Sequence, residues 1–102
     1  NTGGFGNPSS GIHLDNSNNN SLDNNDMTSN DNGVYFNTAN NNTINSGTLT
    51  SNGYGVYITG TTTYNNFTSI TSTTSSSYDL YIDSGNADYN LFKDYDFKKY
   101  YL

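Results

Sequence analysis

Three aspartates crowd the stretch LDNNDMTSNDN and are the densest group of potential cation ligands in the chain: Asp23, Asp26 and Asp31. Calcium takes about six to eight oxygen ligands, which aspartate, asparagine and backbone carbonyls can supply. However, the chain contains no glutamate to close an EF-hand loop, and the equivalents of Asp26 and Asp31 in the next repeat are Thr48 and Gly53. The pattern therefore favours a solvated acidic turn over a calcium site, and we predict no metal site or cofactor.

Four apolar tripeptides recur along the chain, each with a ring-bearing residue at its centre: Ile12-His13-Leu14, Val34-Tyr35-Phe36, Val56-Tyr57-Ile58 and Leu80-Tyr81-Ile82. Alternate side chains of a strand point to opposite faces, so burial of the outer residues turns the central rings outward. Neighbouring strands lie about 4.8 Å apart, so these rings should stack into a ladder. Such a ladder either stabilises strand pairing or forms a contact surface for a sugar or another subunit. The predicted ladder consists of His13, Tyr35, Tyr57 and Tyr81.

Three Asn-X-Ser/Thr tripeptides are candidate N-glycosylation sites, at Asn19, Asn41 and Asn66. Asn19 and Asn41 occupy equivalent positions of the repeat, at predicted corners where the side chain is presented to solvent. Modification requires a host that has the glycosylation pathway. In a chain this rich in asparagine and threonine such tripeptides also arise by chance, so the sequence indicates possible acceptors and leaves their occupancy open.

An internal repeat positions all of these residues. Residues 11–32 align with residues 33–54, and Gly11 and Gly33 are 22 positions apart. The frame continues at Gly55 and returns at Asp79 after a two-residue increase in spacing. A period of this length with short apolar runs is typical of solenoids, in which each repeat forms one coil. We predict one domain over 1–102, with a partial coil or turn at 1–10, coils at 11–32, 33–54 and 55–78, and the last coil and C-terminal segment at 79–102.

Each predicted coil has three short strand signals separated by Asn-rich corners, where asparagine tolerates left-handed backbone angles. The first signal is the apolar tripeptide, whose outer residues point inward. The second has the inward residues Leu22, Ile44, Phe67 and Leu91. The third has Met27, Leu49 and Ile70, with Tyr95 or Phe97 in the last coil. No segment has helical periodicity, so the predicted fold is all-β: a single-stranded right-handed parallel β-helix of about four coils of roughly 22 to 24 residues, with an irregular C-terminal cap or docking segment.

The repeated pattern G-[IV]-x-[LFI]-x-x-S/T-x-N-N-x-[IL]-x-N/S-x-x-[ML]-T-S-N resembles the right-handed parallel β-helix repeats of the pectate-lyase-like superfamily. It is most similar to the Asn-rich NosD-type repeats of archaeal and bacterial surface proteins. The resemblance extends over about Gly11 to Asp94 and implies the fold. It implies no single function, because the superfamily includes lyases, hydrolases, adhesins, tailspikes and spacers.

The residues that the enzymes of this superfamily would need are missing from the expected positions. Lyases of the superfamily use arginine or lysine as the base, but this chain has no arginine and its first lysine is Lys93. No aspartate cluster typical of the hydrolases falls on the first strand of each coil. Copper binding, which the NosD resemblance suggests, needs soft or imidazole ligands, and the chain has one histidine, one methionine and no cysteine. We therefore predict a non-enzymatic protein without copper.

Composition narrows the possible partners. Nine aspartates against three lysines give a net charge of −6, so nucleic acid and anionic membrane surfaces would repel the chain. No apolar run approaches the roughly 20 residues of a membrane span, which predicts no membrane insertion. Abundant Asn, Thr, Ser and Tyr without cysteine indicate an extracellular or cell-surface protein.

The predicted ends of the stack suggest self-association, because unpaired strand edges need a cap or a partner. Candidate docking or cap residues are Phe5, Tyr95, Phe97, Tyr100, Tyr101 and Leu102. Head-to-tail contacts between two different ends generate filaments unless they close a ring.

We therefore expect a structural solenoid, either a self-associating filament subunit or a domain of a cell-surface protein. The first alternative is a carbohydrate-binding or adhesin module that uses the aromatic ladder. The second is ice binding through Thr28, Thr50 and the run from Thr68 to Thr74. It is disfavoured by the expectation that Ser72 follows Thr28 and Thr50 in their column.

Overall fold

The computed structural model describes residues 10–28, 31–50, 52–73, 75–83 and 86–101. Every regular element within these ranges is a β-strand. No described segment forms a helix with the length and apolar character of a membrane span. The strands are β1 (Ser10–Asp15), β2 (Ser21–Asp23), β3 (Asp26–Thr28), β4 (Asn32–Asn37), β5 (Thr43–Thr50), β6 (Tyr54–Thr59), β7 (Asn66–Thr73), β8 (Tyr78–Ile82), β9 (Leu91–Lys93) and β10 (Tyr100–Tyr101).

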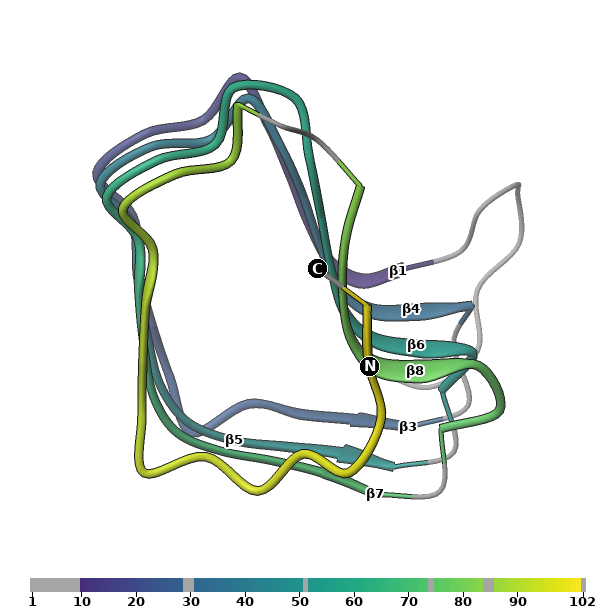
Figure 1. The fold of residues 1–102 in the computed structure, drawn as a ribbon. Coiled ribbons are helices and arrows are strands. Elements are labelled where there is room, and N and C mark those ends of the chain that lie inside the picture. The colour runs from purple at the N-terminus through teal and green to yellow at the C-terminus, as the bar shows by residue number, and fades with distance from the viewer. Residues whose placement is uncertain (1–9, 29–30, 51, 74, 84–85, 102) are drawn as a thin grey trace.

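The strands form two parallel sheets that run along the stack of coils. One sheet has the order β1-β4-β6-β8-β10, and the other has the order β2-β5-β7-β9, with β3 also paired to β5. Every pairing is parallel and joins equivalent positions of successive coils. Viewed along the stack, the coils superimpose (Figure 1). The chain is a parallel β-helix, as predicted.

Left-handed residues turn the chain at three places that recur along the described coils. One set lies where β5 and β7 bend, at Asn24, Ser46, Ser69 and Asp94, with φ of 54°, 58°, 57° and 54°. A second set lies just after the strands of the first sheet, at Asn16, Thr38 and Gly60. A third set occupies the corner before the second sheet, at Asn19, Asn41, Tyr64 and Tyr89. Because the same backbone conformation recurs at equivalent positions of the described coils, the coils stay in register.

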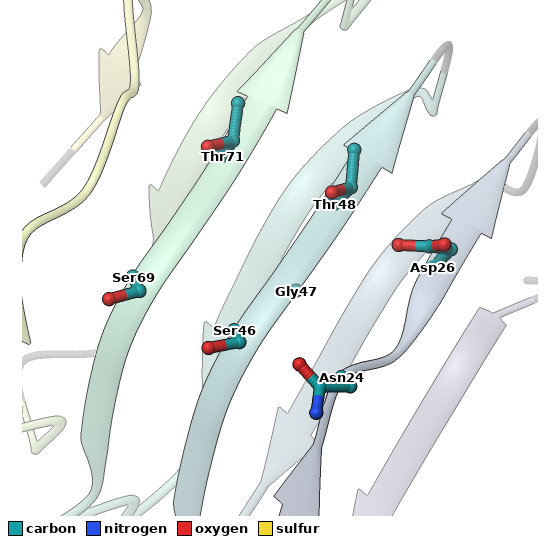
Figure 2. A pocket seen from close by; sticks show the side chains of 7 residues that line it. All are labelled: Asn24, Asp26, Ser46, Gly47, Thr48, Ser69 and Thr71. Carbon is teal, nitrogen blue, oxygen red and sulfur yellow. The ribbon is translucent and has the colours of Figure 1, made fainter.

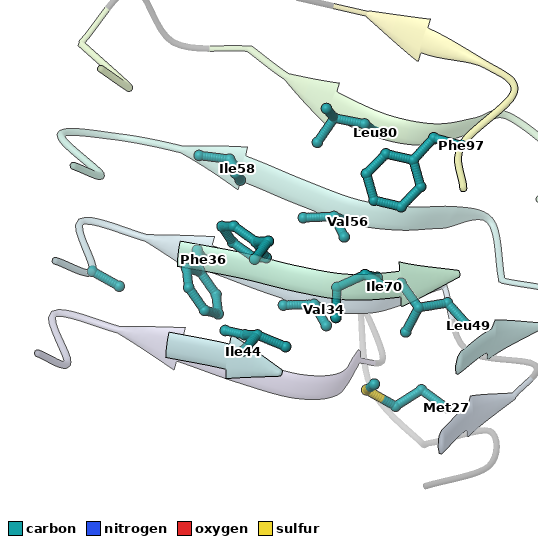
Figure 3. Packing of buried hydrophobic residues seen from close by; sticks show 12 residues of the cluster. Met27, Val34, Phe36, Ile44, Leu49, Val56, Ile58, Ile70, Leu80 and Phe97 are labelled. Atoms are coloured by element: carbon teal, nitrogen blue, oxygen red, sulfur yellow. The ribbon is translucent and has the colours of Figure 1, made fainter. Parts of the chain in front are cut away.

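The core is built as the alternation predicted. Val34, Phe36, Val56, Ile58 and Leu80 are buried between the sheets, and Figure 3 shows them converging with the inward residues of the second sheet. Ile12, Leu14 and Ile82 are partly buried and pack against the same cluster. Burial weakens toward the outer coils because a residue there has a described neighbouring coil on one side only.

The predicted second and third strand signals are one element in the middle coils, since β5 and β7 run through the left-handed bend without a break. Ile70 is buried as predicted, but it pairs with Gly47, and Ser72 follows Leu49 in the third column. Phe97 is the buried residue of the last coil in that column. Tyr95, the other candidate, is 44% exposed.

The predicted inward role of Leu91 is wrong. Leu91 pairs with Asn66 and is 54% exposed, while Phe92 pairs with Phe67 and stacks on its ring at 4.7 Å. The spacing from Phe67 to Phe92 is 25 positions, three more than the basic repeat. A shift of one residue in a strand exchanges the inward and outward faces. The final coil is longer than the others, and this shifts β9 by one residue relative to the predicted register.

A ladder of asparagines, buried in the middle coils and half-buried at its ends, holds the corner before the second sheet: Asn20, Asn42, Asn65 and Asn90. The Oδ1 atom of each later member accepts the backbone N–H of the member one coil earlier, at 2.8, 2.8 and 3.0 Å. The Nδ2 groups of the three later members donate to backbone carbonyls of the preceding coil, for example from Asn65 to Ala39 at 2.8 Å. A buried backbone group without a partner is costly, and this ladder supplies the partners.

Candidate functional site

The predicted aromatic ladder is present on the outer face of the first sheet. His13, Tyr35, Tyr57 and Tyr81 are joined by direct strand pairing, and Tyr101 extends the column by one coil. Consecutive ring centroids lie 4.7 to 5.2 Å apart. The tyrosine pairs meet with interplanar angles of 16° to 33°, whereas His13 meets Tyr35 edge-on at 84°. The ladder therefore consists of stacked tyrosines with an imidazole at one end.

A second aromatic column flanks this ladder and was not predicted. Tyr54 and Tyr78 are paired neighbours at the start of β6 and β8, and their rings lie 6.3 Å apart. Tyr54 meets the rings of Tyr57 and Tyr81 edge-on, each at 5.1 Å. The sequence signal was a tyrosine three positions before the ladder residue in both coils. The two columns together form one interlocked tyrosine surface.

Burial and hydrogen bonding raise the pKa of three ladder phenols, Tyr35, Tyr57 and Tyr81. Tyr57 donates its hydroxyl proton to Oδ2 of Asp83 at 2.5 Å. Burial, followed by this hydrogen bond and the charge of Asp83, raises the pKa of Tyr57 well above its usual value. Burial also raises the pKa of Tyr35 and of Tyr81, with smaller contributions from nearby acidic groups. These three phenols are thus protonated at ordinary pH.

The stacking leaves few ring faces open. Tyr35, Tyr57 and Tyr81 each have an aromatic neighbour on both sides along the column. A sugar ring stacks on an exposed aromatic face, and these residues present mainly ring edges and hydroxyl groups to solvent. The end of the ladder at Tyr101, which is 49% exposed, has the most accessible ring among the ladder tyrosines.

A shallow polar groove of about 300 Å³ crosses the outside of the second sheet. Figure 2 shows its side chains rising from three successive coils: Asn24, Asp26, Ser46, Gly47, Thr48, Ser69 and Thr71. Asn24, Ser46 and Ser69, which all have left-handed backbone angles, form one row of residues in the groove lining. The lining contains a single carboxylate, Asp26, so it offers no pair of titratable groups for general acid–base chemistry.

The threonine columns differ from the sequence prediction. Thr73, and not Ser72, follows Thr28 and Thr50, so that column is continuous over three coils. The outward column beside it contains Asp26, Thr48 and Thr71. The prediction failed because the spacing from Thr50 to Thr73 is 23 positions, one more than in the preceding coil.

A buried carboxylate anchors the last coil and was not predicted. Asp79 takes the position of Gly55 in the repeat, and Ser72 takes that of Leu49. The Asp79 carboxylate accepts hydrogen bonds from the Ser72 hydroxyl at 3.1 Å and from the amides of Lys98 and Lys99 at 2.6 and 3.0 Å. Burial disfavours its charge, but these hydrogen bonds, with one from a neighbouring serine, outweigh burial and lower its pKa. The sequence indicated this site by an aspartate at a repeat position that glycine occupies in the earlier coils.

The predicted docking or cap residues separate into different environments. Phe97 is in the core, whereas Tyr95 and Tyr101 are exposed. The backbone of Tyr100 pairs with Leu80, so β10 continues the first sheet. An isolated bridge from Thr71 to Asp96 likewise continues the second sheet. Phe5 and Leu102 lie outside the described residues.

The remaining candidate residues are on the surface. The three glycosylation candidates, Asn19, Asn41 and Asn66, are exposed, and their modification stays a prediction. Asp23, Asp26 and Asp31 are exposed as well, and Asp23 accepts a hydrogen bond from Asn45 at 3.1 Å. Within the described part of the chain, no three His, Cys, Asp or Glu side chains gather closely enough to hold a metal ion.

The stacked parallel coils and the repeated outward column define a right-handed parallel β-helix repeat protein. Residues 3–97 match the family model described as "Periplasmic copper-binding protein (NosD)". The chain belongs to this family. Comparisons with curated proteins and with solved structures gave no significant match.

The donor groups of this chain do not fit the copper site that the family description implies. Copper sites in proteins use imidazole, thiolate and thioether ligands. The single histidine, His13, packs edge-on against Tyr35 on the outer face, and the single methionine, Met27, is buried in the core. The chain has no cysteine. These donors lie on opposite faces of the coil wall and cannot share one ion.

Proposed function

We propose that the chain is a non-enzymatic structural β-helix located outside the cytoplasm, whose coils stack end to end with those of a second copy. The family description, a periplasmic protein, supports the location. The observation that carries the stacking is the distribution of exposed large apolar side chains. Of the five in the described residues, Tyr89, Leu91, Tyr95 and Tyr101 belong to the last coil, and the fifth is Tyr64. Exposed apolar surface of this kind marks contact sites.

The opposite end offers a matching surface. Ile12, Leu14 and Leu22 in the first described coil are only partly buried, although their equivalents in the next coil are fully buried. A coil placed against them would complete the same core columns. The strand edge of β1 at this end would pair with that of β10 of another copy, as parallel strands do throughout the solenoid.

Charge supports a head-to-tail orientation. The segment 32–77 contains no charged residue, residues 10–31 contain four aspartates, and all three lysines lie beyond residue 92. Paired strands place Asp23, Asn45, Thr68 and Lys93 in one column. In a head-to-tail stack, the Lys93 end of this column in one copy faces the Asp23 end of the column in the next copy. Opposite charges that face each other across a contact attract.

Sedimentation velocity over a concentration series, with electron microscopy of the same samples, tests the proposal. We expect reversible association and short rods. Replacing exposed apolar groups in the double variant Leu91→Asn, Tyr101→Ser should weaken association at least tenfold while the circular dichroism spectrum is retained. A wild-type chain that stays monomeric throughout, or a double variant that associates as strongly as the wild type, would refute the stacking.

A charge exchange tests the orientation. Lys93→Asp should weaken association by a factor of about two to five, because exposed ion pairs contribute roughly 0.2 to 1 kcal/mol. The double variant Lys93→Asp, Asp23→Lys should restore it. Equal association of the single and double variants would argue against a head-to-tail contact along this column.

Glycan binding by the ladder has weaker support, because the internal tyrosine faces are covered by their neighbours. Ice binding gains support from the corrected columns, in which Thr48 and Thr50 pair with Thr71 and Thr73. The regular array is interrupted by Asp26 in the first coil, so we rank it below stacking. Measurement of thermal hysteresis would reveal this activity directly.

A further inference from the structure

Two exposed tyrosines stack against each other at a corner of the solenoid, away from the tyrosine ladder. The rings of Tyr64 and Tyr89 are almost parallel, with an interplanar angle of 5° and centroids 5.0 Å apart. They are 58% and 73% exposed, the two highest values among the large apolar side chains. The two tyrosines belong to successive coils, so their stacked rings connect these coils at an exposed position of the surface.

The backbone at both positions is unfavourable for an aromatic residue. Tyr64 and Tyr89 have φ of 59° and 58°, in the left-handed region. The equivalent residues of the first two coils are Asn19 and Asn41, with φ of 61° and 57°. Asparagine adopts this conformation readily, whereas for a bulky side chain it is a rare and strained state. Strain that a fold retains at an exposed position is a reason to look for a role.

We propose that Tyr64 and Tyr89 are a site of oxidative crosslinking, at which a dityrosine bond joins the last two coils. Hydrogen peroxide, acting through a peroxidase, is the oxidant. Each phenol loses one electron and its hydroxyl proton, and the two phenoxyl radicals couple through ring carbons ortho to oxygen. The ortho hydrogens then move to the oxygens and restore both phenols. Overall, two tyrosines and one peroxide give one dityrosine and two waters.

The geometry distinguishes this pair from the ladder. Both residues lie in turns outside the strands, so their rings can approach without breaking a sheet. The ladder residues are held by strand pairing, their rings are less exposed, and Tyr57 also donates its hydroxyl proton to Asp83. The nearly parallel stacking holds the two phenol rings against each other, with their centroids 5.0 Å apart. A crosslink here would fasten neighbouring coils in a chain that has no cysteine for a disulfide.

The test treats the dilute folded chain with a haem peroxidase and hydrogen peroxide. We expect dityrosine fluorescence, an intact monomer mass lower by two hydrogen atoms, and a crosslinked proteolytic peptide containing Tyr64 and Tyr89. The matched variants are Tyr64→Asn and Tyr89→Asn, which introduce the residue of the first two coils and so preserve the corner conformation. Each should reduce the intramolecular product at least tenfold.

Tyr95→Phe is the control, because it removes another exposed phenol from the last coil and should leave the yield unchanged. Circular dichroism before oxidation establishes that all variants are folded. The proposal is overturned if the intramolecular crosslink maps to other tyrosines, if only covalent dimers form, or if Tyr64→Asn retains the wild-type yield. A crosslinked monomer should also resist urea to a higher concentration than the untreated chain.

Discussion

Replacing Asn65 by alanine should destabilise the solenoid far more than replacing a solvent-facing asparagine. The Asn65 side chain is fully buried and makes three hydrogen bonds: it accepts from the Asn42 amide and donates to the Ala39 carbonyl and to Asn90 Oδ1. Alanine removes all three. Asn90 Oδ1 keeps a partner, since it also accepts the backbone N–H of residue 65. The Asn42 amide and the Ala39 carbonyl lose these partners.

The magnitude follows from the two groups left without those partners. An unsatisfied buried donor or acceptor costs about 1 to 3 kcal/mol, so the variant should lose roughly 2 to 6 kcal/mol of unfolding free energy. This is a large part of the roughly 5 to 15 kcal/mol typical of a domain. Asn45→Ala is the matched control, because the Asn45 side chain is exposed and bonds Asp23 at 3.1 Å. Water can replace that bond, and the loss should stay within about 0.5 kcal/mol.

Urea denaturation followed by circular dichroism measures both variants. Asn65→Asp separates hydrogen bonding from volume, because it can still accept the Asn42 amide but places an oxygen opposite the Ala39 carbonyl. We expect it to be destabilised at neutral pH as well. If Asn65→Ala lies within about 1 kcal/mol of Asn45→Ala, the ladder is not the source of stability argued above.

Three further changes test the register, the glycine column and the buried carboxylate. Phe92→Ala should cost about 2 to 4 kcal/mol in urea unfolding and Leu91→Ala less than about 0.5 kcal/mol, and the reverse order would refute the observed register. Gly55→Ala should cost about 1 to 3 kcal/mol, because its Cβ would lie 2.5 Å from the Asp79 carbonyl oxygen; Gly47→Ala, with 3.2 Å to its nearest atom, should cost less. The folded pKa of Asp79 is below its ordinary value near 3.8, so its stabilisation is present above that pH and is lost as the pH falls through the folded pKa. The stability difference between wild type and Asp79→Asn should therefore shrink in acid, and a difference that grows would contradict the assignment.

The repeat was sufficient to predict the first strand of each of the first three coils. Gly11, Gly33 and Gly55 are evenly spaced, and the apolar tripeptide after each alternates in the manner of a strand. Only a parallel stack buries all of these outer residues together, so the tripeptides and their ring-bearing centres were placed correctly. The aromatic ladder followed directly, because identical faces of paired strands lie one above another.

The last coil could not be predicted in the same way. Its spacing is longer, and two adjacent apolar residues, Leu91 and Phe92, compete for one inward position. Composition does not distinguish them. The choice depends on which backbone groups of the previous coil are paired, and the amide of Leu91 donates to the Asn65 carbonyl at 2.8 Å. That contact joins segments far apart in the chain, so it exists only in the folded solenoid.

The hydrogen-bonded carboxylate of Asp79 likewise could not be predicted from the sequence. In sequence, Ser72 and Asp79 look like two separate departures from the repeat, one in an apolar column and one in a glycine column. In the structure they are neighbours, and Asp79 binds the amides of Lys98 and Lys99 from the next turn of chain. A buried carboxylate is stable only when several donors converge on it. Here those donors come from two coils, and stacking is what brings them together.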